Sequence, residues 1–120
     1  MGKALELIRL FEEDQTFTPP ATVAAEAKKA IAWKEKYKDE VKGGTQVGWV
    51  RASQLAKRDK ISLKTIKRMK SFFDRHEKNK NVASDKKESP WRDNGHIAWL
   101  IWGGDAGRSW AEKILGASDE

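Results

Sequence analysis

The chain has 120 residues, with 24 lysines and arginines, 18 aspartates and glutamates, six tryptophans and no cysteine. This length suits one domain that buries roughly two thirds of the surface of its unfolded chain, and the lack of cysteine excludes disulfides and thiolate metal sites. The longest apolar run, residues 97–102, is far shorter than the roughly 20 residues of a membrane span, so we expect no membrane insertion. Glu6, Glu12 and Glu13 stand where a signal peptide would be apolar, so we do not expect export.

The net charge of +6 is unevenly distributed along the chain. Residues 41–80 carry 12 basic and 3 acidic side chains, a net charge of +9, whereas residues 1–40 and 81–120 carry −1 and −2. Charge concentrated in this way attracts an anionic partner to one surface. The alternative interpretation is a solvated basic face without a partner. The tryptophans are interpreted first as core, since each can bury about 150–250 Å², with a ligand groove as the alternative.

The periodicity of apolar residues is helical almost throughout. It predicts a first helix over residues 3–13, which residues 16–20 interrupt. Thr18-Pro19-Pro20 then indicates a helix start, because proline is tolerated in the first turn of a helix. The alanine-, lysine- and glutamate-rich stretch that follows, to about residue 40, is predicted to be the longest helix.

The glycines of residues 42–48 predict a loop. A short helix is expected after it, over about residues 49–58, with Val50, Leu55 and Ala56 facing the core.

A tight turn at Asp59-Lys60 leads to the segment SLKTIKRMKSFF, residues 62–73. Ser62 is predicted to cap a helix that ends at about residue 76 or 77. One side of this helix is apolar, with Leu63, Ile66, Met69 and Phe73. The other side is basic, with Lys64, Lys67, Arg68 and Arg75.

Residues 78–92 are polar, and we expect a mobile loop there. Two closing helices are predicted after this loop, over about residues 93–102 and 105–115. Gly103 and Gly104 would end the first of them, and Asp105 would cap the second. With no strand pattern in the sequence, the predicted fold is an all-α bundle of five or six short helices in one domain.

The segment LAKRDKISLKTIKRM, residues 55–69, resembles a helix-turn-helix, with Lys60 at the turn position where that family usually has glycine. In such proteins the second helix enters the major groove of DNA. The resemblance implies DNA contacts from Lys64, Lys67 and Arg68 on one exposed ridge. The further predicted contacts are basic residues on or near the same pair of helices: Arg51, Lys57, Lys60 and Arg75. Neutralising phosphates releases counterions without any sequence match, so low specificity is expected.

A second resemblance covers about residues 18–115. The segments VGWVRASQLA, SLKTIKRMKSFFDRHEKNK and GHIAWLIWGGDAGRSWAEKI are similar to a small helical domain that recurs in tailed-bacteriophage proteins, including head-assembly polypeptides. This resemblance implies a viral protein located in the host cytoplasm or the virion. It implies no defined activity.

No enzymatic motif is complete. GGDAGRS, residues 103–109, is one residue short of a phosphate-binding loop and has Arg108 in place of its lysine. His76-Glu77 lacks a second histidine one turn later, where Lys80 stands. Folding could bring His76 together with Asp74, Glu77 and Asp93. We predict that the protein is not an enzyme and has no catalytic residue, cofactor or metal site.

The sequence supports two candidate functions. The first is a nucleic-acid-binding protein that contacts DNA with little sequence specificity. The second is a phage head or virion assembly module that binds an acidic protein surface, with an exposed Trp91 as the candidate partner anchor and an apolar patch around it. The sequence leaves the oligomeric state and the target sequence open.

Overall fold

The computed structural model describes residues 15–118, so the helix expected at residues 3–13 lies outside the described chain. Within it are five α-helices: α2 (Ala21–Tyr37), α3 (Gln46–Ala56), α4 (Leu63–His76), α5 (Asn94–Ile101) and α6 (Gly104–Ser118). Four single turns of 3-10 helix accompany them: η1 (Lys38–Glu40), η2 (Glu77–Asn79), η3 (Ser84–Lys86) and η4 (Pro90–Arg92). The predicted all-α fold is confirmed.

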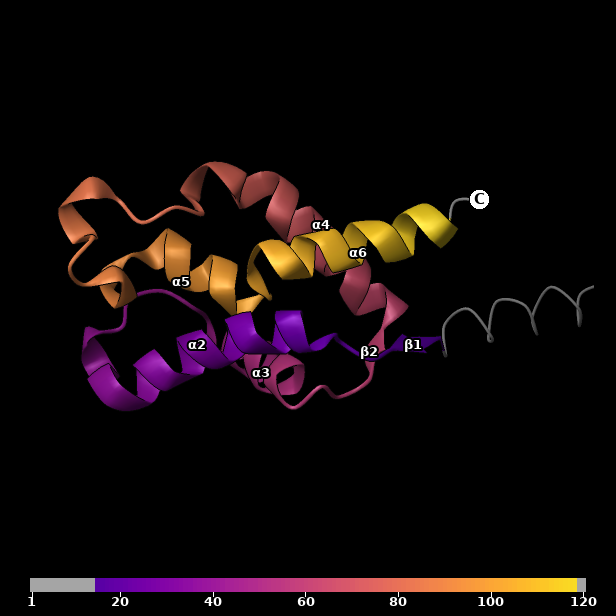
Figure 1. Ribbon diagram of the computed structural model, residues 1–120, viewed down its shortest axis with the longest axis horizontal. Helices are drawn as coiled ribbons and strands as arrows, with labels where there is room; N and C mark the ends of the chain where they lie inside the picture. The colour runs from indigo at the N-terminus through magenta and orange to yellow at the C-terminus, as the bar shows by residue number, and fades with distance from the viewer. Residues whose placement is uncertain (1–14, 119–120) are drawn as a thin grey trace, which may run out of the picture.

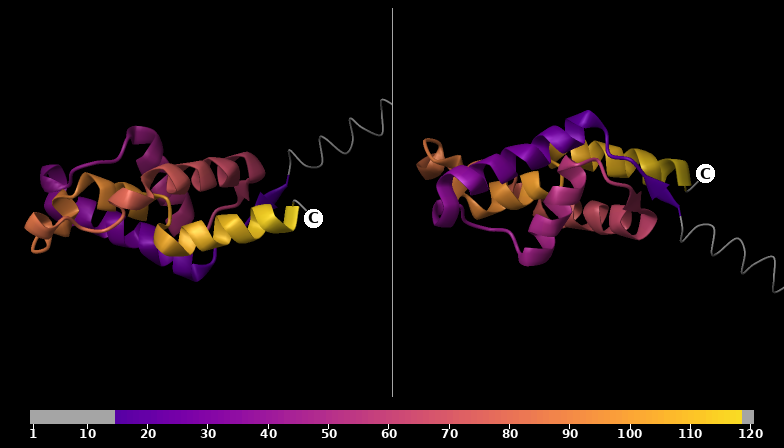
Figure 2. Two further views of the ribbon diagram at one scale, coloured as in Figure 1. Left: turned by 90° about the horizontal axis from the view of Figure 1, so that it is seen from above. Right: turned by 90° about the horizontal axis from the view of Figure 1, so that it is seen from below.

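The helices share one core. α2 packs against α3, α5 and α6, while α4 packs mainly along α6 (Figures 1 and 2). The core combines aliphatic and aromatic side chains from all five helices, among them Val23, Leu55, Ile66, Phe73, Ile97, Trp99 and Ala111. No helix between residues 15 and 118 is long and apolar enough to cross a membrane.

The alanines of α2 let a neighbouring helix approach closely. Ala24, Ala27 and Ala30 are buried together with Val23, and α3 packs on this helix. As predicted, α2 starts directly after Pro20 and is the longest helix of the described chain.

Helix α3 corrects two sequence expectations. It begins at Gln46 and not near residue 49, because the Thr45 hydroxyl caps it by accepting a hydrogen bond from the Gly48 N–H at 3.0 Å. Val50 was expected in the core but is 54% exposed. The buried positions are Gly48, Ala52 and Leu55. Val50 lies two residues from both Gly48 and Ala52, about 200° around the helix, and therefore points away from the core.

Two short strands were not expected. β1 (Thr16–Phe17) pairs antiparallel with β2 (Ile61–Ser62). With β2 included, six residues join α3 to α4, more than the three or four of a helix-turn-helix turn. The Ser62 cap is confirmed, since its hydroxyl accepts a hydrogen bond from the Thr65 N–H at 3.2 Å.

The corner between α5 and α6 depends on glycine. Gly103 and Gly104 have φ of 106° and 63°, which agrees with their predicted role in ending α5. Asp105, however, does not cap α6. The helix starts at Gly104, and the Asp105 carboxylate accepts a hydrogen bond from the Trp99 indole N–H at 2.9 Å.

The polar segment of residues 78–92 contains no α-helix, as predicted. Its backbone is attached to the domain by several hydrogen bonds, one of them between the Lys80 carbonyl and the His96 ring at 2.8 Å. The Ala83 N–H donates to the Asp93 carboxylate at 2.7 Å, and the Trp91 carbonyl accepts from the Lys42 N–H at 3.1 Å. Its mobility stays a prediction.

Two glycines of α6 provide a matched test of the packing. A methyl group on Gly107 would lie 2.6 Å from the Trp102 carbonyl oxygen and 3.2 Å from the Phe73 ring, whereas one on Gly116 would meet nothing within 4 Å. We expect Gly107→Ala to lower the free energy of unfolding by about 1–3 kcal/mol through overpacking. Gly116→Ala should raise it by up to about 1 kcal/mol. Urea unfolding followed by circular dichroism measures both, and equal effects would contradict the close approach at Gly107.

Candidate nucleic-acid interface

The outer face of α4 borders a hollow of about 610 Å³, which we call the basic groove. It lies between α4, α3 and the C-terminal end of α5, and its lining residues are Val47, Arg51, Lys64, Lys67, Arg68, Ser71, Phe72, Arg75 and Trp102. Five of the seven predicted contacts therefore come together. Lys57 and Lys60 do not line the groove, and both are exposed in the connection between α3 and α4.

The shape of this surface differs from the expected ridge. Lys64, Lys67 and Arg68 are exposed on one face of α4, as the helical spacing predicts. Arg51 of α3 lines the same hollow, so that cations from two helices border one concave surface. A surface of this form can surround an anion from several sides.

The groove contains positive charge without compensating carboxylates. No aspartate or glutamate lines it, and in the described part of the chain none of its five cations forms an ion pair. Asp74 on α4 is instead 2.6 Å from the Lys70 ammonium, and Glu77 is 3.1 Å from the Arg108 guanidinium. The carboxylates nearest in sequence are thus bound by other cations.

Arg51 is the most constrained cation of the groove. One of its terminal nitrogens, Nη1, donates to the Gln54 side chain at 2.8 Å, but its Nε is buried without a hydrogen-bond partner in residues 15–118. Burial, followed by the positive charge of Arg68, lowers the pKa of the Arg51 guanidinium. A buried donor without a partner is unfavourable. An anion in the groove would reduce the repulsion between Arg51 and Arg68.

Two aromatic rings complete the lining. Phe72 and Trp102 lie nearly parallel, with ring centroids 5.4 Å apart and an interplanar angle of 25°, and both are partly exposed. Neither residue was among the contacts predicted from the sequence. Phe72 follows Arg68 by four residues, so the helical spacing alone could have placed it beside the basic face. Trp102 reaches the groove only through the packing of α5, which no local pattern reveals.

Trp91 is not the exposed anchor that was expected. Its ring stacks on Tyr37 at a centroid distance of 3.7 Å with planes 2° apart, and it also contacts Trp33. The side chain is partly buried against the core. Trp91 therefore attaches the polar loop to α2.

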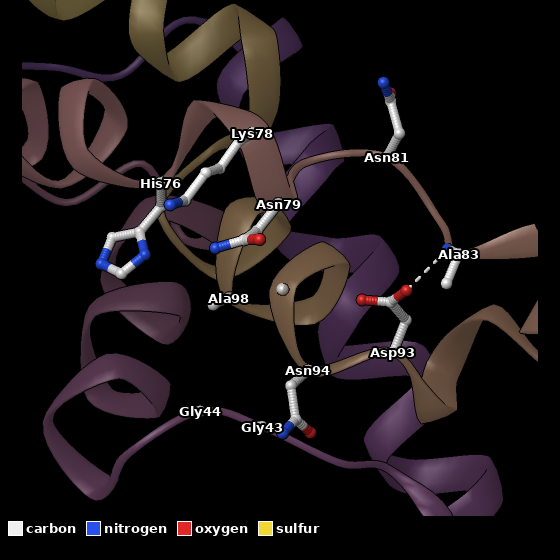
Figure 3. Close-up of a pocket in the computed structure, with 11 residues that line it drawn as sticks. Gly43, Gly44, His76, Lys78, Asn79, Asn81, Ala83, Asp93, Asn94 and Ala98 are labelled. Atoms are coloured by element: carbon white, nitrogen blue, oxygen red, sulfur yellow. Dashed lines mark hydrogen bonds between the residues drawn. The ribbon is translucent and has the colours of Figure 1, made fainter.

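A second hollow, of about 650 Å³, lies between the C-terminal end of α4 and the start of α5 (Figure 3). His76 and Asp93 line it, but Asp74 and Glu77 do not, so the four-residue grouping considered from the sequence is not formed. The Asp93 carboxylate accepts hydrogen bonds from the backbone N–H groups of Ala83 and His96, at 2.7 and 3.0 Å.

Asp93 consequently has a structural role. Burial acts to raise the pKa of its carboxyl, but the backbone hydrogen bonds and the charge of Lys86 outweigh burial, so the pKa lies below the ordinary value of 3.8. A carboxylate held ionised in this way at the start of α5 is an N-cap and a poor proton acceptor. Within residues 15–118 no three histidine, aspartate or glutamate side chains gather as metal ligands.

Compared with known protein families, curated proteins and solved structures, the chain matches none. The structure itself defines the class: an all-α domain with a basic, partly aromatic groove. The phage-domain resemblance stays a prediction.

Repulsion among the groove cations should lower the free energy of unfolding by a measurable amount. Arg68 follows Lys64 by one helical turn, and like charges at this spacing destabilise a helix by about 0.2–0.5 kcal/mol. We expect Arg68→Gln to raise the free energy of unfolding by about this amount in low salt and to have no effect in about 1 M salt, where screening is nearly complete. Lys28→Gln on α2 is the control and should show no such salt-dependent gain. A loss of stability in Arg68→Gln at low salt would contradict the description of the groove.

Proposed function

We propose that this protein binds nucleic acid through the basic groove, chiefly by phosphate contacts and with little sequence specificity. The observation that carries the proposal is the convergence of five cations on one hollow without a lining carboxylate. Phosphates would replace the missing counter-charges, and the released counterions would favour binding.

The composition of the groove supports low specificity. Asparagine and glutamine, whose amides pair with adenine edges, are absent from the described lining. Lysine and arginine dominate instead and contact phosphates of any sequence. Lys57 and Lys60, exposed just before α4, stay predicted as additional phosphate contacts outside the groove.

A protein partner is the second candidate function. Val47 and Val50 on α3 are 62% and 54% exposed and would give an acidic protein an apolar edge beside the cations. The proposed phage setting, with assembly as its role and the host cytoplasm or virion as its place, rests on the sequence resemblance. Nucleic acid is favoured because single exposed valines are common on protein surfaces.

Simultaneous replacement of Lys64, Lys67 and Arg68 by alanine tests the proposal. With random-sequence DNA in an anisotropy titration at two salt concentrations, we expect binding to weaken by at least about tenfold in low salt. The slope of log K against log salt should fall by about one for each phosphate that the variant no longer neutralises. The control replaces Lys28, Lys87 and Lys113, which are exposed and outside the groove, and changes the net charge equally. Equal weakening in both variants would mean that overall charge, and not the groove, drives binding.

A carboxylate introduced into the groove gives an independent test. Val47 lines the groove and lies in the first turn of α3, where an acidic side chain suits the helix dipole, and Arg51 follows it by four residues. Val47→Glu should therefore preserve or raise stability while weakening DNA binding by about tenfold. Val50→Glu removes an equally apolar exposed residue from the same helix outside the groove and should bind more tightly than Val47→Glu. Unchanged DNA binding in Val47→Glu would exclude the groove as the site.

A further inference from the structure

The basic groove combines two features that a duplex cannot use together. We infer that its occupant is an unpaired stretch of nucleic acid, with a base stacked against the Phe72–Trp102 pair and the adjoining phosphates bound by the cations of α3 and α4. This inference rests on the proposed function and adds the substrate class.

The aromatic rings distinguish a single strand from a duplex. Phe72 and Trp102 line the same hollow as Arg51 and Arg68, so aromatic and cationic side chains border one space. In a duplex the faces of the bases are covered by their neighbours, and a protein reads only base edges. An unpaired base exposes its face and can stack on an aromatic side chain next to bound phosphates.

The concave form of the surface also disfavours a duplex. A helix that reads the major groove must project beyond its neighbours. Here Val47 and Arg51 of α3 flank the exposed face of α4, and the six-residue connection departs from the usual turn. A thin, flexible strand can enter such a hollow more readily than a duplex can.

The basic residues of α4 set the length of strand that fits. From Lys64 to Arg75 the helix rises about 16 Å at 1.5 Å per residue. This equals the length of roughly five nucleotides stacked at 3.4 Å each. The groove cations therefore extend along a few nucleotides, with Phe72 near the Arg75 end. Phosphates and base faces are shared by DNA and RNA, so the experiment includes both.

The experiment compares equal numbers of phosphates in unpaired and paired form. Fluorescein-labelled ten-residue oligothymidylate and oligouridylate are titrated with the full chain, next to a DNA hairpin duplex of matched phosphate number. We expect at least one of the single strands to bind about tenfold more tightly than the hairpin. Equal binding of both single strands would indicate that the protein does not distinguish deoxyribose from ribose. A preference for one would assign the ligand as DNA or as RNA. Polyglutamate serves as a competitor that represents an acidic protein. It should displace the oligonucleotide only when its carboxylate concentration is much higher than the phosphate concentration.

The stacking contact is tested by Trp102→Leu, with Trp110→Leu as the matched control. Trp110 lies on α6, is partly buried like Trp102, and does not line the groove. Loss of one stacked base should weaken single-strand binding by about 5- to 100-fold in Trp102→Leu. Hairpin binding should stay unchanged, Trp110→Leu should bind normally, and Trp102→Phe should retain most of the affinity. Thermal unfolding of each variant shows whether it folds.

If Trp102→Leu does not fold, Trp102→Phe still decides the question. Stacking predicts that oligonucleotide binding quenches the tryptophan fluorescence of the parent protein more than that of Trp102→Phe. Equal quenching, hairpin binding as tight as single-strand binding, or equal displacement by polyglutamate would overturn the inference while leaving binding itself intact. Failure of every nucleic acid to bind would instead reject the proposed function.

Discussion

The burial of one side of α4 determines both the shape of the domain and the position of its charge. Ile66, Met69 and Phe73 are fully buried, and α4 packs along α6 through this face. Once these side chains are in the core, the rotation of α4 about its axis is set. Lysines and arginines at intervening positions must then point outward. The basic groove is therefore a direct consequence of hydrophobic packing.

Two carboxylates close in sequence to the groove cations of α4, Asp74 and Glu77, pair with Arg108. Arg108 on α6 lies 3.1 Å from both Glu77 and Glu112 and 3.7 Å from Asp74. These contacts, first the hydrogen bond with Glu77, raise the pKa of the Arg108 guanidinium. Because these pairs are largely exposed, each contributes little to stability. Their more important effect is to hold carboxylates beside Arg108, on the α6 side of α4.

Sequence reasoning succeeded where the determining interactions are local. The Ser62 cap, the two faces of α4 and the glycine corner after α5 all depend on residues within about one turn of each other. The five converging cations were found for the same reason, since four of them are on α4.

The expectations that failed depend on partners distant in sequence or on competition between neighbours. Trp91 was expected to be exposed because it lies in a polar segment. The tyrosine on which it stacks, Tyr37, is 54 positions earlier, so no local pattern indicates the contact. Val50 was placed in the core because it is apolar, although the small residues Gly48 and Ala52 occupy the face that packs inward. The β1–β2 pair consists of two residues on each side, too short for any alternation pattern.

The corner at Gly103 connects the core to the basic groove. A side chain at this position would come within 2.8 Å of Val23 on α2, and the residue immediately before it is Trp102, whose ring lines the groove. The same backbone turn thus sets how closely α2 and α6 approach and where the aromatic ring is presented. Adjustments of interior volume around Val23 would be transmitted to the Trp102 ring, so substitutions deep in the domain offer a route for reshaping the groove without altering any surface residue.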